Sequence, residues 1–90
     1  MALALALVER VAALAQAAGL QAEAVLRAAL PPGALSVCDA SDVDFATPAA
    51  SLAHYDLHLL DGRGHCRALT EDLESATGFV LARKPAGGRP

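Results

Sequence analysis

The amino-acid sequence predicts a small α+β domain, with two N-terminal helices packed on a mostly antiparallel sheet of about four strands and a short helix before the last strand. Three observations support this fold class. Alanine and leucine recur at helical spacing early in the chain, apolar and polar residues alternate in the second half, and proline and glycine separate the two parts. Ninety residues provide one hydrophobic core. We therefore expect residues 1–83 to form a single domain and residues 84–90 a flexible tail.

The first helix is predicted over residues 2–18, because its apolar residues recur every three or four positions, and Gly19 ends it. These residues form two adjacent rows: Leu3, Leu7, Val11, Leu14 and Ala18 in one, and Leu5, Val8, Ala12 and Ala15 in the other. So wide an apolar face suits either a broad contact within one chain or a helix that packs on the sheet and on a second copy. The interface expected in the second case consists of Leu3, Leu5, Leu7, Val8 and Val11.

The second helix is predicted over residues 21–29, with Val25, Ala29 and Leu30 turned toward the core. Alanine favours this helix strongly. The sequence Pro31-Pro32-Gly33 then ends the helix, because proline cannot continue it.

Residues 14–30 resemble the helix-turn-helix of LacI-type repressors, in which an Ala-x-x-Ala-Gly-Val turn leads to a recognition helix. The matching positions, which pack the two helices together, are Ala15, Ala18, Gly19, Leu20, Val25 and Arg27. The resemblance implies that the residues facing DNA are Ala22, Glu23, Leu26 and Arg27. Base and phosphate contacts need polar and basic side chains, and only Arg27 is basic. A helical hairpin therefore explains the pattern better, and a helix-turn-helix regulator is the third functional hypothesis.

The middle of the chain is predicted to be a strand followed by a long loop. Leu35 and Val37 alternate with polar positions over residues 34–40, as in a short strand. Residues 39–51 form a loop rich in aspartate, whose spacing does not match a calcium-binding EF-hand. We expect Val43 and Phe45 to anchor this loop to the core.

A β-hairpin is predicted from the next segment. Tyr55, Leu57 and Leu59 alternate with His54, Asp56 and His58, which indicates a strand with one buried and one solvent-facing side. The sequence Asp61-Gly62-Arg63-Gly64 favours a two-residue type II′ turn with Gly62 at positive φ. The resulting register pairs Leu59 with Cys66, His58 with Arg67 and Leu57 with Ala68.

The solvent-facing side of this hairpin is a candidate metal site. His54, Asp56 and His58 lie on one side of the strand, and His65 lies on the same side of its partner. Alternate strand positions are about 6–7 Å apart, so two such side chains can share a Zn²⁺ ion. However, Arg67 opposite His58 repels a cation, and Cys66 points to the other face. The competing interpretation is a polar or partner-facing sheet surface without metal.

The last part of the chain is predicted to be a short helix followed by a buried strand. Thr70 can cap a helix over residues 70–77, and Gly78 can end it. Residues 79–82 are wholly apolar, which is typical of a central strand covered on both faces.

Composition and motifs restrict the function. The net charge of −3 argues against non-specific binding to nucleic acid or to an anionic membrane surface. No apolar segment is long enough to span a bilayer, and no secretory signal is recognisable. We expect Cys38 and Cys66 to be free thiols in the reducing cytoplasm, with Cys66 buried behind the hairpin. The sequence has neither a glycine-rich phosphate loop nor a nucleophile elbow, and we assign no catalytic residue.

These observations predict a cytoplasmic accessory or protein-interaction domain without enzymatic activity, whose partner is another protein or a second copy of the chain. The alternative is a metal- or small-ligand-binding domain that uses the face formed by His54, Asp56 and His58. Zinc is the cofactor that this alternative implies.

Overall fold

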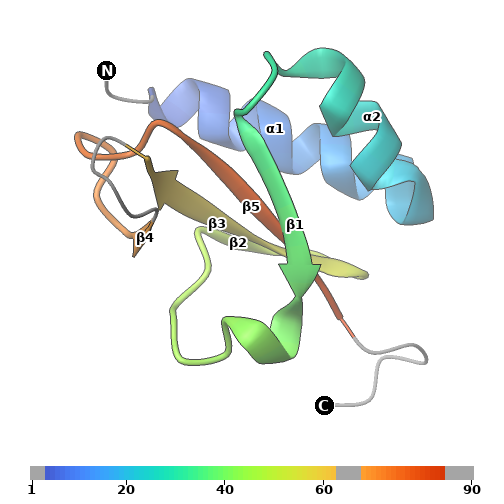
Figure 1. The fold of residues 1–90 in the computed structure, drawn as a ribbon. Coiled ribbons are helices and arrows are strands. Elements are labelled where there is room, and N and C mark those ends of the chain that lie inside the picture. The colour runs from blue at the N-terminus through green and yellow to red at the C-terminus, as the bar shows by residue number, and fades with distance from the viewer. Residues whose placement is uncertain (1–3, 63–67, 85–90) are drawn as a thin grey trace.

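The computed structural model describes residues 4–62 and 68–84 and has two helices on one face of a five-stranded mixed sheet (Figure 1). The predicted α+β class is therefore confirmed. The helices and strands are α1 (Leu5–Ala18), α2 (Ala22–Ala29), β1 (Leu35–Asp39), β2 (Ala50–Ser51), β3 (Tyr55–Asp61), β4 (Ala68–Thr70) and β5 (Gly78–Arg83). Two 3₁₀ turns, η1 (Gly19–Gln21) and η2 (Ala40–Asp42), follow α1 and β1. No helix in the described part of the chain is long and apolar enough to cross a membrane.

The strand order is β1-β5-β3-β2, and β4 also pairs with β3. β1 runs parallel to β5, whereas β3 runs antiparallel to β2, β4 and β5. The prediction of about four mostly antiparallel strands therefore differs from the observed sheet, which has five strands and one parallel pair, β1 with β5. Local sequence does not reveal these features, because β2 has two residues and because strand direction depends on how the chain crosses the sheet.

The helices cover one face of the sheet and enclose the main core. α1 is long and α2 has only eight residues. Val8, Val11 and Ala15 of α1 are buried against sheet residues that include Leu57 and Phe79. The other residues of this core are Ala22, Leu26, Leu35, Tyr55, Leu59, Ala76 and Leu81.

The connection between the helices differs in one respect from the prediction. Gly19 ends α1 with a φ of 58°, and its amide donates to the carbonyl of Ala15, which confirms its role as the C-terminal cap. The turn η1 separates the two helices, and α2 is rotated about its axis so that Leu26 is fully buried whereas Ala29 is exposed. The predicted inward set of Val25, Ala29 and Leu30 was therefore wrong at Ala29.

The β3–β4 pairing differs from the predicted hairpin. The observed partners are Leu59 with Thr70, Leu60 with Leu69, and Asp61 with Ala68. This register is displaced by four residues from the predicted one, so a two-residue turn is excluded. Gly62 does not have positive φ, and its amide donates to the Thr77 hydroxyl at 2.9 Å. Arg63, His65, Cys66 and Arg67 lie outside the described residues.

The helix predicted over residues 70–77 is replaced by a single turn. The Thr70 hydroxyl does accept from the Asp72 amide, and the Asp72 carboxylate accepts from the Glu74 amide. Thr77 then donates its amide to the carbonyl of Leu60, which draws the end of the segment onto β3. This long-range pairing leaves room for only the first helical turn.

Gly78 has a packing role rather than the predicted role at the end of a helix. A Cβ atom at Gly78 would lie 2.6 Å from the carbonyl oxygen of Ala34, which accepts a hydrogen bond from Phe79. Only glycine lets β5 approach the chain before β1 this closely. The strand that follows is central and buried from Gly78 to Ala82, as predicted.

Candidate binding pocket on the sheet face opposite the helices

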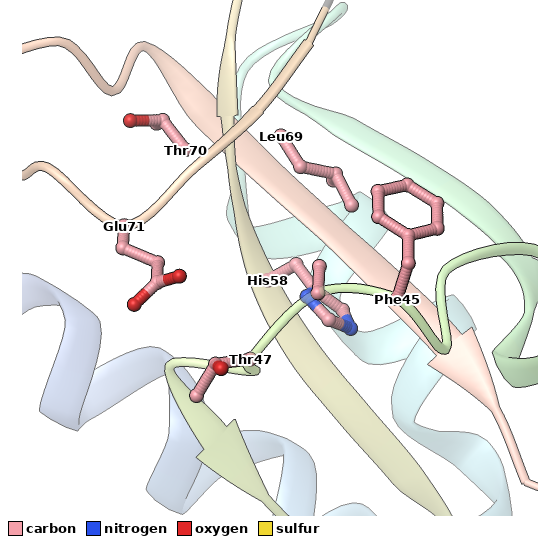
Figure 2. A pocket seen from close by; sticks show the side chains of 7 residues that line it. Phe45, Thr47, His58, Leu69, Thr70 and Glu71 are labelled. Carbon is pink, nitrogen blue, oxygen red and sulfur yellow. The ribbon is translucent and has the colours of Figure 1, made fainter.

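The sheet face opposite the helices has a pocket where β2 and β4 meet at the edge of β3. β2 pairs with β3 as far as Leu57, and β4 begins its pairing at Leu59, so His58 lies at the break between them. The pocket has a volume of about 210 Å³. Its lining residues are Phe45, Ala46, Thr47, His58, Leu69, Thr70 and Glu71 (Figure 2).

His58 forms the base of the pocket. Its side chain lies on the face opposite Leu57 and Leu59, because successive strand residues point to opposite sides. The residue is only 3% exposed. Within residues 4–62 and 68–84, no hydrogen bond to the imidazole is found. The predicted solvent-facing side of β3 is therefore buried at His58, and also at Leu60.

Burial determines the protonation of His58. Removal of the imidazole from water lowers the pKa of His58 below 6.5, and the carboxylate of Asp56 opposes this effect only in part. The ring is therefore neutral at pH 7, with one nitrogen that donates and one that accepts a hydrogen bond.

Phe45 forms the outer wall of the pocket. Val43 in the same loop is buried, but Phe45 is 80% exposed, so the prediction that both residues anchor the loop was wrong for Phe45. Figure 2 shows the phenyl ring beside Leu69 and above His58. A large apolar side chain is thus presented to solvent next to a hollow.

The polar groups around the pocket include hydrogen-bond acceptors and hydroxyl donors. Thr47 and Thr70 contribute hydroxyl groups, and Glu71 contributes a carboxylate. The Thr70 oxygen already accepts from the Asp72 amide. The segments that line the pocket, 45–47 and 69–71, contain one acidic residue, Glu71, and no basic residue. Glu71 is therefore the charged group of this lining.

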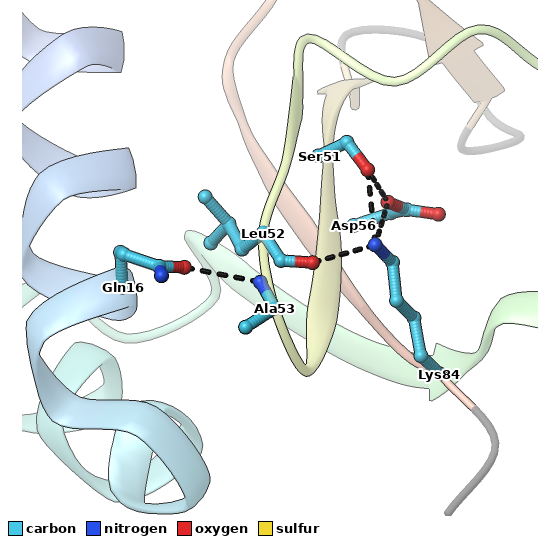
Figure 3. Close-up of polar contacts among 6 residues, drawn as sticks. All are labelled: Gln16, Ser51, Leu52, Ala53, Asp56 and Lys84. Carbon is cyan, nitrogen blue, oxygen red and sulfur yellow. Dashed lines mark hydrogen bonds and ion pairs between the residues drawn. The ribbon is translucent and has the colours of Figure 1, made fainter. Parts of the chain in front are cut away.

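The predicted metal ligands do not all reach this pocket. His54 is exposed in the turn before β3. Asp56 is held by Ser51, whose hydroxyl donates to its carboxylate at 2.9 Å, and by Lys84, whose Nζ lies 3.5 Å away (Figure 3). His65 lies outside the described residues. Among the residues that the structure describes, no group of three histidine, cysteine or acidic residues could hold a metal ion.

Lys84 and Gln16 tie the β2–β3 turn to the rest of the molecule. The Lys84 ammonium donates to the Ser51 hydroxyl and to the carbonyl of Leu52. Gln16 of α1 accepts from the amide of Ala53 (Figure 3). Asp56 therefore belongs to a structural polar cluster and is separate from the pocket.

The predicted interface residues of the first helix are divided between core and surface. Val8 and Val11 are buried in the chain's own core, and Leu7 packs partly against it. Leu5 is 58% exposed, and Leu3 lies outside the described residues. Of the described members of this set, only Leu5 offers most of its side chain to a partner.

The resemblance to a DNA-binding helix does not extend to the surface of α2. Ala22 and Leu26, which were expected to face DNA, are fully buried. Glu23 and Arg27 form an exposed ion pair at 3.7 Å. Two of the four positions expected to face DNA are therefore turned into the core.

Cys38 is a free thiol, as predicted. Burial raises the pKa of this thiol above 9.0, and the nearby carboxylates of Asp42 and Asp39 raise it further, against a smaller opposing effect of Arg83. The thiol is therefore protonated at neutral pH and is a poor nucleophile. Cys66 lies outside the described residues.

Sequence reasoning found His58 but missed the residues around it. Phe45 and Thr47 come from the loop before β2, and Leu69 and Glu71 come from β4 and the turn after it. The available signal was composition, because Phe45 is one of only three aromatic residues and occurs in an aspartate-rich loop.

Residues 8–84 match the model of a family described as a family of unknown function, DUF6129. Because the match covers most of the chain, the protein belongs to this family. No curated protein and no solved structure matches it.

Proposed function

We propose that this member of DUF6129 is a small, non-enzymatic accessory domain that binds another protein through the pocket on the helix-free sheet face. We also propose the cytoplasm as its place of action, in keeping with the free thiol of Cys38. The pocket is the part of the described surface where an exposed aromatic side chain, a buried polar group and a hollow occur together.

The observation that carries this proposal is the position of Phe45. The side chain is 80% exposed and lies directly beside a pocket whose base is the buried His58. Aromatic side chains next to desolvated pockets are typical centres of binding energy in protein interfaces. A phenyl group left in water has a cost that a partner surface can remove.

Small-ligand binding at the same pocket is the second candidate function. The nearly buried His58, whose ring lines the pocket, favours it, because a ligand could hydrogen-bond to the imidazole. This candidate uses His58 without His54 and Asp56, which the structure places elsewhere. It therefore replaces the metal site proposed from the sequence.

The test is a selection of random peptides displayed on phage against the purified protein. We expect selected peptides to bind the wild type and to lose binding to the Phe45→Ser variant. The control is Leu20→Ser, because Leu20 is also highly exposed, at 72%, but lies in the turn between the helices. Equal binding to wild type and Phe45→Ser would contradict the proposed surface.

A further inference from the structure

We infer that the pocket binds the guanidinium group of an arginine side chain presented by the partner protein. This inference rests on the proposed protein-binding function and specifies the chemistry that the pocket recognises. It follows from the hydrogen-bonding character of the lining residues, from the burial of His58 and from the charge of Glu71.

The lining residues offer acceptors to a ligand. The Glu71 carboxylate accepts only, the Thr47 hydroxyl can accept, and the neutral His58 ring has one accepting nitrogen. An arginine side chain has five N–H donors in a planar arrangement and no acceptor. The donors of a guanidinium group therefore match the acceptors that Glu71, Thr47 and His58 present.

The exposed ring of Phe45 adds a second type of contact. Its position above His58 leaves the phenyl group exposed at the mouth of the pocket (Figure 2). A guanidinium plane stacks on an aromatic face and is attracted by its quadrupole. Guanidinium is also more weakly hydrated than ammonium, so its transfer into a half-buried pocket costs less. These properties favour arginine over lysine.

The buried imidazole separates this site from an ordinary acidic surface. His58 is only 3% exposed, and its ring lines the pocket without a hydrogen bond to any described residue. Among the described residues no side-chain nitrogen or oxygen is both fully buried and unpartnered, so the imidazole nitrogens of His58 remain accessible from the pocket, where a ligand donor can reach the accepting nitrogen. The Glu71 carboxylate of the lining provides the attraction for a cation.

A metal ion fits the described residues less well than an organic cation does. A bound zinc or calcium ion needs several histidine, cysteine or oxygen ligands at short distance. Among the described residues, no three histidine, cysteine or acidic side chains converge. A volume of about 210 Å³ is instead large enough for one extended side chain.

The experiment is a titration of the full chain with three blocked pentapeptides, Gly-Ser-X-Ser-Gly, in which X is arginine, lysine or citrulline. Citrulline has nearly the shape of arginine but no charge. We expect the arginine peptide to shift the side-chain NMR signals of His58 and Phe45, the lysine peptide to bind more weakly, and the citrulline peptide not to bind. Equal shifts with arginine and citrulline would overturn the inference.

Matched variants test which residues hold the cation. Glu71→Gln should weaken binding of the arginine peptide by about tenfold or more, because a charge-assisted hydrogen bond is lost. Phe45→Leu keeps the apolar bulk and should weaken it by about two- to fivefold through loss of the aromatic face. Glu74→Gln is the control, since it removes a nearby exposed carboxylate that does not line the pocket. Equal effects of Glu71→Gln and Glu74→Gln would show non-specific attraction and overturn the inference.

The outcomes for the two proposals are distinguishable. If displayed peptides bind at Phe45 but contain no arginine, the protein-binding function stands and the arginine inference fails. Free arginine amide is the last probe. If it shifts the NMR signals of His58 as strongly as the arginine peptide does at equal concentration, the ligand of the pocket is a small molecule and the inference about a partner protein is overturned.

Discussion

The two faces of the sheet differ in how completely the chain covers them. On the helix side, apolar residues of β1, β3 and β5 meet two helices, and the enclosed side chains form one continuous core. On the opposite side, His58 and Leu60 are buried, but Phe45 in the loop above them remains exposed. The comparison indicates that the helix side provides stability and that the opposite side retains a surface suited to binding.

The largest expected difference in stability between the two faces is that between substitutions of their phenylalanines. Phe79 is 1% exposed on the helix side, and Phe79→Ala should lower the free energy of unfolding by about 3–5 kcal/mol. Phe45→Ala should change it by less than about 0.5 kcal/mol, because the ring is mostly in solvent. Urea unfolding followed by circular dichroism measures both. A large loss of stability in Phe45→Ala would mean that the opposite face is as tightly packed as the helix side.

Glycine substitutions test the join between β1 and β5. Gly78→Ala should destabilise by about 1–3 kcal/mol, because the new Cβ atom meets the rigid backbone oxygen of Ala34 at 2.6 Å. Gly62→Ala is the control, since its Cβ atom would meet only the Thr77 hydroxyl, at 3.2 Å. Thermal unfolding of the two variants should therefore give a clearly lower Tm for Gly78→Ala. Similar Tm values for the two would contradict the close approach at Gly78.

Ion pairs at the ends of the sheet should contribute less to the free energy of unfolding than the close approach at Gly78 does. Lys84→Met breaks a half-buried cluster with Asp56 and Ser51, and we expect a loss of about 1 kcal/mol. Arg83→Met removes an exposed pair with Asp39, and its effect should stay below about 0.5 kcal/mol. The difference in stability between the two variants should persist in roughly 0.5–1 M salt, because burial limits screening of the pair between Lys84 and Asp56. An equal effect of the two substitutions would argue against a structural role of the cluster.

The buried imidazole of His58 predicts a pH effect on stability. Because burial lowers the pKa of His58 in the folded state, the unfolded chain binds a proton more readily below pH 6.5. The wild type should therefore lose stability as the pH falls below 6.5 toward the folded-state pKa of His58. His58→Gln should reduce this loss. Unfolding free energies of the wild type and His58→Gln, measured at pH 7 and pH 5, provide the comparison.

Part of the candidate site could be read from the sequence and part could not. The alternation around His58 located that residue on a strand face different from that of Leu57 and Leu59, as observed. The alternation also predicted solvent exposure of that face, which was wrong for His58. Phe45 was misassigned for a similar reason, because its residue type favours burial whereas the path of its loop leaves it in solvent.

The sequence alone determined the local elements of this protein. Helical spacing and Gly19 defined α1, the two prolines ended α2, and apolar runs located β1, β3 and β5. These features depend on neighbouring residues, whose backbone preferences and spacing are visible in the chain itself. Only the tertiary structure decided the parallel direction of β1, the register of β4 and the burial of His58. Those features depend on contacts between residues far apart in the chain, so a pattern in one segment does not contain them.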